Sequence, residues 1–161
     1  MIILGLDPGL ASTGFGAIFC AKEPPRLHTA GRIETTAGDP IAKRLFQIFE
    51  DINSLLAKLR PELVAIENVF SLVRYPKAGI ILGQVLGVIY LSAYQHGLPI
   101  LEITPKEVKN ALVGTGSATK QQIKSATGRI LGIREFSSLH AADAVAVALT
   151  AYYRKGYAES R

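Results

Sequence analysis

The chain has 161 residues, of which 48% are hydrophobic and 19% charged, and its formal net charge is +5. This length and composition are typical of a soluble α/β protein and exclude a disordered or fibrous chain, so we expect residues 1–161 to form a single domain. The single Cys20 excludes an intrachain disulfide and no secretory signal pattern is present, so we expect a cytoplasmic protein in which Cys20 is a buried structural thiol.

The positive charge is concentrated in the second half of the chain. Residues 1–80 contain nine Lys and Arg against eight Asp and Glu, whereas residues 81–161 contain nine against five. An excess of this kind suits a polyanionic partner such as nucleic acid. A solvated basic surface without a partner explains the charge equally well.

Three strands are predicted at the start of the chain. Ile2–Asp7 is a short apolar run that ends before Pro8-Gly9, Gly14–Ala21 is a second run, and Arg26–Glu34 is a third. The connections between them are short, and one passes through a proline turn at positions 23–25. We therefore expect the three strands to form an antiparallel meander.

The apolar residues then change to helical spacing, which predicts a helix from Pro40 to Leu59. The next elements in chain order are a strand at Leu63–Glu67, a helix over 77–95, a strand at Pro99–Ile103, and helices from Pro105, over 119–131 and from Ser137 to Arg154. This order predicts an α/β fold with a five-stranded mixed sheet flanked by helices on both faces.

The stretch from 78 to 94, AGIILGQVLGVIYLSAY, carries no charge. It is shorter than the roughly 20 residues of a membrane-spanning helix, and Gln84 and several glycines interrupt it, so we predict a buried helix and no membrane association. Gly83 and Gly87 lie four residues apart and give the helix one smooth face. That face is compatible with packing in the interior or with a subunit interface.

Two of the predicted strands end in an acid. Asp7 closes the run IILGLD, and Glu67 closes LVAIE. In sheets of this kind the ligand crevice lies beyond the carboxyl ends of the parallel strands, so the two carboxylates are placed to converge there. Each acid taken alone is also compatible with a turn residue or a helix cap.

The last predicted helix contributes His140 and Asp143. They are three residues apart and lie on one helical face, while the helix is almost wholly apolar from there through Leu149. Buried polar groups need partners, and a metal ion would satisfy both side chains. A simple His–Asp hydrogen bond near the helix N-terminus is the alternative interpretation.

The residue types favour one class of metal. Ser137, His140 and Asp143 lie within about one helical turn, which leaves no geometry for a serine-hydrolase relay. One cysteine and no paired histidines exclude a structural zinc site of the usual kind. Carboxylates with one imidazole suit Mg²⁺ or Mn²⁺.

Four segments, in this order and spacing, resemble the RuvC family of bacterial Holliday-junction resolvases: LGLDPGLASTGFG, AIENVF, LVGTGSATKQQI and HAADAVAVALT. The resemblance runs from residue 3 to about residue 152, and it implies a ribonuclease H-like fold and a homodimer. It also implies that Asp7, Glu67 and Asp143 bind metal. His140 occupies a fourth position, at which many members have Asp and some have His.

The resemblance implies an endonuclease that resolves four-way DNA junctions. It would nick two symmetric strands and leave 5′-phosphate and 3′-hydroxyl ends, in homologous recombination and DNA repair, together with the junction-binding and branch-migration proteins RuvA and RuvB. We hypothesise that Asp7, Glu67, His140 and Asp143 are the catalytic residues and hold two divalent ions beside the scissile phosphate. Mg²⁺ is the expected ion, and the imidazole favours Mn²⁺.

Three further residues are expected to bind DNA. The resemblance aligns Lys109 and Lys120 with basic residues near the cleaved strand, and Lys120 also begins a predicted helix, where backbone N–H groups favour phosphate. The resemblance aligns Phe70 with an aromatic residue that lies against the junction centre, where a ring can stack on a base. Solvated lysines and a core phenylalanine are the alternatives that the residues alone leave open.

Three other functions remain compatible with parts of the sequence. An actin-like ATP-binding domain also begins with a strand that ends in DxG, but such proteins pair two domains and 161 residues have room for one. A different ribonuclease H-like nuclease, acting on RNA–DNA hybrids or on RNA precursors, would use the same acids. A non-catalytic nucleic-acid-binding module would require the acids to be incidental.

Overall fold

The computed structural model describes residues 1–20, 24–68 and 76–159, and a five-stranded mixed sheet forms its centre. The strand order is β3-β2-β1-β4-β5, which puts β1 in the middle of the sheet. The strands are β1 (Ile2–Asp7), β2 (Ser12–Phe19), β3 (Arg26–Glu34), β4 (Leu63–Glu67) and β5 (Ile100–Ile103).

The pairing confirms the predicted meander. β1 pairs with β2 and β2 with β3 in antiparallel fashion, whereas β1 with β4 and β4 with β5 are parallel pairs. The carboxyl ends of β1, β4 and β5 therefore lie at one edge of the sheet. Both acids that end a predicted strand, Asp7 and Glu67, lie at this edge.

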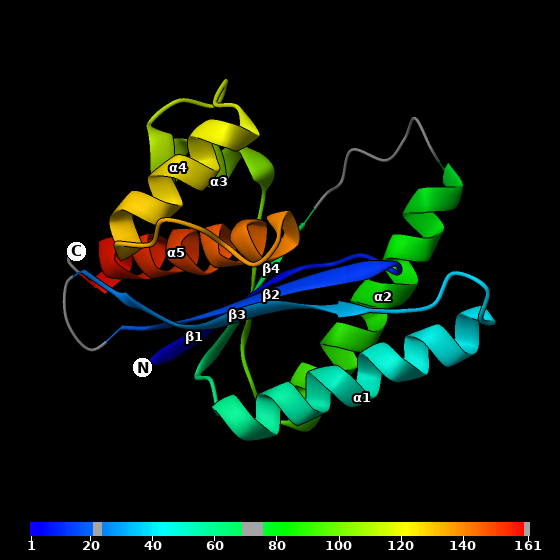
Figure 1. The fold of residues 1–161 in the computed structure, drawn as a ribbon. Coiled ribbons are helices and arrows are strands. Elements are labelled where there is room, and N and C mark those ends of the chain that lie inside the picture. Colours follow the sequence, from blue (N-terminus) through cyan, green and yellow to red (C-terminus); the bar gives the residue numbers. More distant parts are fainter. Residues whose placement is uncertain (21–23, 69–75, 160–161) are drawn as a thin grey trace.

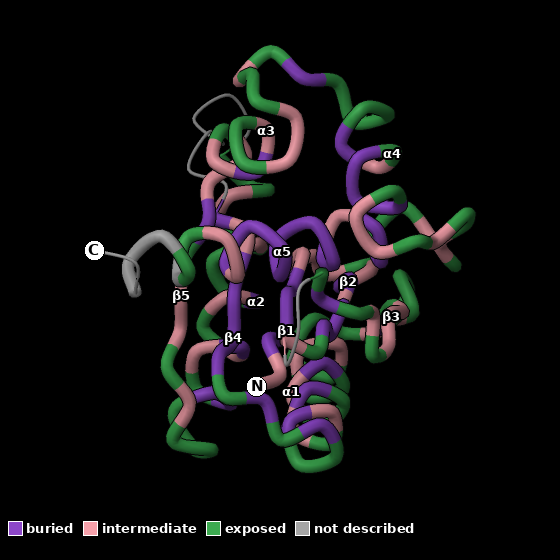
Figure 2. Tube along the Cα trace, turned by 90° about the vertical axis from the view of Figure 1, so that its left-hand side faces the viewer, coloured by how far each residue is buried: buried purple, intermediate pink, exposed green. Residues whose placement is uncertain are grey.

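Helices cover both faces of the sheet, as predicted (Figure 1). One face is covered by α1 (Ile41–Leu59) and α2 (Pro76–Gln95), and the other by α3 (Pro105–Val113), α4 (Lys120–Leu131) and α5 (Leu139–Glu159). Figure 2 shows that burial is concentrated in β1, β4 and the first part of α5. α5 is thus the helix that packs most closely on the sheet.

Glycines in the first two strands make this close packing possible. A Cβ at Gly5 would lie 2.1 Å from the Ala144 carbonyl oxygen, and one at Gly14 would lie 2.1 Å from the His140 carbonyl oxygen. A Cβ at Gly16 would meet Val145 at 2.3 Å. Only residues without a side chain allow the α5 backbone to approach the strands this closely, and this approach brings the start of α5 over the end of β1.

The prediction that the apolar helix is buried is wrong. Among the described residues of α2, the buried ones are Val85, Ile89, Ser92 and Ala93, on the side that packs against the sheet and α1. By length and composition alone α2 could cross a membrane, and only 22% of its apolar window is buried. Its other side stays exposed because no element described in this chain covers it, and that side includes Ile80, Ile81, Leu91 and Tyr94.

Smaller differences concern the ends of elements. The second strand runs over Ser12–Phe19, not Gly14–Ala21, so Cys20 follows the strand and is half-buried instead of fully buried. Ser138 and Thr119 cap the last two helices through side-chain hydrogen bonds. Phe70 lies outside the described residues.

Candidate active site

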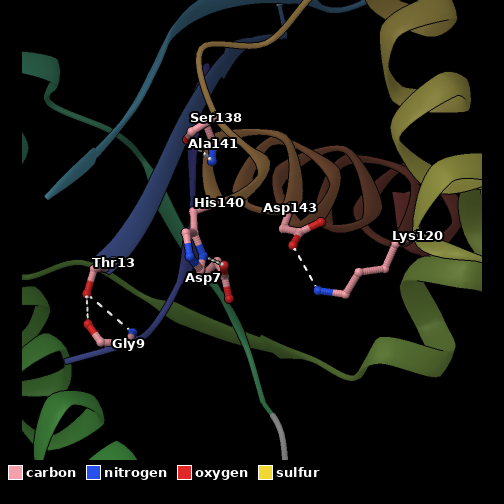
Figure 3. A network of polar contacts seen from close by, with 8 residues as sticks. All are labelled: Asp7, Gly9, Thr13, Lys120, Ser138, His140, Ala141 and Asp143. Carbon is pink, nitrogen blue, oxygen red and sulfur yellow. Dashed lines mark hydrogen bonds and ion pairs between the residues drawn. The ribbon is translucent and has the colours of Figure 1, made fainter. Parts of the chain in front are cut away.

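Asp7 ends the central strand and begins a tight turn. Thr13 is fully buried, and its hydroxyl donates a hydrogen bond of 2.7 Å to the Gly9 carbonyl oxygen and accepts one of 3.3 Å from the Gly9 N–H. These bonds tie the start of β2 to the turn that follows Asp7 (Figure 3). The carboxylate of Asp7 is therefore held at a defined position, with 15% of its side chain exposed.

The start of α5 brings two further site residues to Asp7. The Ser138 hydroxyl accepts a hydrogen bond of 3.0 Å from the Ala141 N–H, which caps the helix. Within this first turn His140 Nδ1 is hydrogen-bonded to Asp7 Oδ2 at 2.8 Å. Asp143 follows three residues later on the same side of the helix (Figure 3). The alternative prediction, a hydrogen bond between His140 and Asp143, is not the contact found: His140 is hydrogen-bonded to Asp7 of another element, and Asp143 to Lys120.

Lys120 reaches the site from α4. Thr119 caps this helix through a capping box with Gln122, so Lys120 is its first residue. The Lys120 ammonium lies 3.3 Å from Asp143 Oδ2, while 87% of the lysine side chain is exposed. The contact raises the pKa of Lys120, mainly through attraction to Asp143. The ammonium is therefore a permanent positive charge at the rim of the site.

Glu67 completes the group from the neighbouring parallel strand. Leu6 of β1 pairs with Ile66 of β4, so the next residues, Asp7 and Glu67, end the two strands at the same level. Burial raises the pKa of Glu67 to about 7, and repulsion from Asp7 and Asp143 adds to this effect. Burial also raises the pKa of Asp7, against the opposing hydrogen bond from His140.

These electrostatics fit a cation site. Burial and repulsion from neighbouring carboxylates raise the pKa values of Asp7 and Glu67, and the positive charge of Lys120 offsets this only in part. Carboxylate oxygens with one imidazole are ligands suited to Mg²⁺ or Mn²⁺. Among the described residues, no group of three or more His, Cys, Asp or Glu side chains is arranged so that it could hold a metal ion as it stands. The chemistry of the donor set nevertheless fits a divalent cation.

Of the remaining predicted residues, Lys109 does not enter this group, and Phe70 lies outside the residues that the structure describes. Lys109 lies on α3 and, within the described ranges, makes no ion pair with the site carboxylates. Sequence reasoning also missed Asn68, which follows Glu67 and is hydrogen-bonded by its side chain to Glu102 on β5. No local pattern marks this pair, because the two residues meet only through the pairing of β4 with β5.

Comparisons with known proteins agree with the fold. The sequence model of the family described as "Crossover junction endodeoxyribonuclease RuvC" matches residues 3–151. A crossover junction endodeoxyribonuclease RuvC of Gloeobacter violaceus is 43% identical over 157 residues, which cover 95% of this chain and 88% of that protein.

Solved structures extend the similarity to three dimensions. The Thermus thermophilus RuvC structure superposes with a TM-score of 0.88 at 32% identity and covers 98% of this chain and 97% of its own. T. thermophilus RuvC in complex with Holliday junction substrate gives a TM-score of 0.90 at 32% identity, with coverage of 97% and 96%. The predicted ribonuclease H-like fold and the predicted family are confirmed, and the chain belongs to the RuvC family of crossover junction endodeoxyribonucleases.

Proposed function

We propose that this chain cleaves four-way DNA junctions by nicking two symmetric strands, leaving 5′-phosphate and 3′-hydroxyl ends, in homologous recombination and DNA repair. The observation that carries the proposal is the convergence of Asp7, Glu67, His140 and Asp143 at one edge of the sheet. A relative of the same fold has been solved with Holliday junction substrate, and family membership supports the same substrate here.

Asp7, Glu67, His140 and Asp143 would hold two divalent cations. Bound ions of this kind activate a water for attack on phosphorus and stabilise the leaving oxygen. Asp7 suits the central place among the ligands because it ends the middle strand and lies between the carboxylates of β4 and α5. The choice between Mg²⁺ and Mn²⁺ depends on the imidazole, which Mn²⁺ tolerates better.

The chain's own groups orient the substrate. Lys120 offers its ammonium beside the carboxylates, where it can bind a phosphate oxygen of the cleaved strand. His140 is held by Asp7 through Nδ1, which leaves Nε2 on a half-exposed ring as the nitrogen for a metal ion, a water or the substrate. Lys109 and Phe70 are further proposed DNA contacts.

A homodimer would place two such sites on the two strands to be cut. A four-way junction has approximate two-fold symmetry, which an isologous dimer matches. The exposed apolar side of α2 supports this interface, because Ile80, Leu91 and Tyr94 are all more than half exposed in one chain. A Cβ at Gly83 or Gly87 would meet nothing within 4 Å, so both glycines face open space that a second copy can fill.

In the cell we propose a soluble cytoplasmic enzyme that acts with junction-binding and branch-migration partners, RuvA and RuvB. The excess of positive charge in residues 81–161 suits a DNA partner.

Cleavage of a synthetic four-way junction tests the proposal. In Mg²⁺ or Mn²⁺ the wild-type chain should nick the junction in preference to linear duplex, flap and RNA–DNA hybrid, and Asp7→Asn should remove cleavage without removing junction binding. His140→Asp should shift the preference toward Mg²⁺. Normal cleavage by Asp7→Asn, or preferred cleavage of the hybrid, would overturn the assignment.

A further inference from the structure

The residue after Glu67 is fixed to the neighbouring strand from both its backbone and its side chain. The Asn68 N–H donates a hydrogen bond of 2.9 Å to the Ile103 carbonyl oxygen. The Asn68 side-chain amide, which is buried, donates to one carboxylate oxygen of Glu102. Asn68 cannot move without breaking both bonds, and Glu67 shares a peptide bond with it.

Glu102 is itself held from another element. Its second carboxylate oxygen accepts a hydrogen bond from the hydroxyl of Tyr90 on α2. Burial and the contact with Glu102 together raise the pKa of Tyr90 to about 12, so the hydroxyl keeps its proton and remains a donor at physiological pH. Glu102 is the one exposed residue of β5, yet both of its carboxylate oxygens are engaged in these contacts.

The backbone around Glu102 is anchored as well. Arg154 of α5 donates a hydrogen bond of 3.1 Å to the Glu102 carbonyl oxygen and makes an ion pair of 3.1 Å with Glu107. Glu107 in turn closes the capping box at Thr104, directly after β5. These contacts hold the backbone of Glu102 in place on β5, which lies beside β4 in the sheet (Figure 2).

We propose that Glu102 is a positioning residue for Glu67: through Asn68 it fixes the end of β4, and through Tyr90 it ties that end to the position of α2. The proposal rests on the proposed function, because it assigns Glu67 to a cation site. The Tyr90–Glu102–Asn68 contacts form a relay from α2, which carries the exposed apolar side, to a carboxylate of the candidate active site. Loss of a group that is hydrogen-bonded directly to a metal ligand typically lowers metal affinity 10–100-fold. Glu102 acts on Glu67 through the neighbouring Asn68, so we expect a loss at the lower end of that range.

Calorimetric titration of the metal-free chain with Mn²⁺ measures the effect without DNA or cleavage. Asn68→Ala and Glu102→Ala should each weaken Mn²⁺ binding about tenfold. The double variant should weaken it no further, because both changes remove the same contact. Glu102→Gln should restore most of the affinity, since its side-chain oxygen still accepts from Asn68. Tyr90→Phe should cause a smaller loss in the same direction.

Glu50→Ala is the matched control, because Glu50 is exposed on α1 and its removal changes the net charge by the same amount. Junction binding without metal should be unchanged in all variants, since the relay acts on the carboxylate and not on the DNA surface. Wild-type Mn²⁺ affinity in Glu102→Ala, or two single losses that multiply in the double variant, would overturn the proposal.

Two readouts separate this inference from the proposed function. If the wild-type chain fails to cleave junctions, the proposed function fails, while the Mn²⁺ titrations still decide the relay. If Glu102→Ala does not fold, Asn68→Ala and Tyr90→Phe carry the test, because each removes one of the two hydrogen bonds to Glu102 and leaves Glu102 itself in place. Wild-type Mn²⁺ affinity in Tyr90→Phe would then reject the link to α2.

Discussion

Glu67 is held in surroundings that disfavour its charge. In the unfolded chain a glutamate has an ordinary pKa of 4.5, whereas burial and two neighbouring carboxylates raise the pKa of Glu67 to about 7. The folded chain therefore keeps a proton that the unfolded chain releases. This contribution to stability is fully present below pH 4.5 and is lost as the pH rises through about 7. A buried carboxylate that destabilises the folded protein at neutral pH is characteristic of a functional site.

Glu67→Gln should therefore stabilise the metal-free protein at pH 8, because it removes a buried charge and keeps the shape. The expected gain is on the order of 2–3 kcal/mol in the free energy of unfolding, measured by urea denaturation in a chelator. The gain should shrink at pH 5, where the wild-type carboxyl is protonated. Glu50→Gln, at an exposed position, should change stability by less than about 0.5 kcal/mol. A Glu67→Gln chain less stable than wild type would contradict this account.

Metal affinity should depend on pH for the same reason. Below about pH 7 a divalent cation must displace a proton from Glu67, so the affinity should fall by up to about tenfold per pH unit. Calorimetry with Mn²⁺ at pH 6 and pH 8, in buffers of different ionisation enthalpy, measures the affinity and the released proton together. Equal affinity at the two pH values, with no proton release, would remove Glu67 from the site.

Individual site residues were predictable from the sequence where they interrupt an apolar pattern. Asp7 and Glu67 end apolar strands, and His140 and Asp143 stand at the start of an apolar helix. The contact between Asn68 and Glu102 was not predictable. The two residues are 34 positions apart in the sequence and meet only because β4 pairs with β5 in one particular register, which no local sequence pattern indicates.

At the scale of elements, the site depends on how closely α5 lies on the sheet. Asp7 is the register partner of Gly14, and Gly14 lies under the His140 backbone. The absence of a side chain at Gly14 therefore sets the height of His140 above Asp7.

Gly14→Ala should push the start of α5 away from β2. The new Cβ would lie 2.1 Å from the His140 carbonyl oxygen, so the helix must shift, at a cost of about 1–3 kcal/mol in stability. The shift should also weaken the His140–Asp7 contact and lower Mn²⁺ affinity. Gly38→Ala is the control, since a Cβ there meets nothing within 4 Å. Wild-type stability and affinity in Gly14→Ala would show that α5 is placed by other contacts.

Most helices and strands were predictable from the sequence. The spacing of apolar residues indicates whether a segment is a helix or a strand, and Gly and Pro mark where it ends. The exception is the environment of α2. Its uncharged sequence predicts burial, but a sequence does not distinguish burial within a chain from burial against a second one. Only one side of α2 is buried in the single chain, and Leu91 and Tyr94 remain exposed.

At the scale of the whole molecule, this exposed side predicts the state of assembly. Gly87→Trp should fold normally, because Gly87 is exposed and a Cβ there would meet nothing within 4 Å, and it should block a close helix contact between two copies. Sedimentation should show a wild-type dimer and a monomeric variant that binds junctions poorly. Gly38→Trp, at another open position, should remain dimeric. A dimeric Gly87→Trp chain would place the interface elsewhere.

The central claim is that Asp7, Glu67, His140 and Asp143 form one cation site. The most direct test is anomalous scattering from crystals grown with Mn²⁺. We expect anomalous peaks within bonding distance of the carboxylate oxygens of Asp7, Glu67 and Asp143, with at least one peak close to His140. Mn²⁺ bound only elsewhere on the molecule, at concentrations that support junction cleavage, would contradict the account.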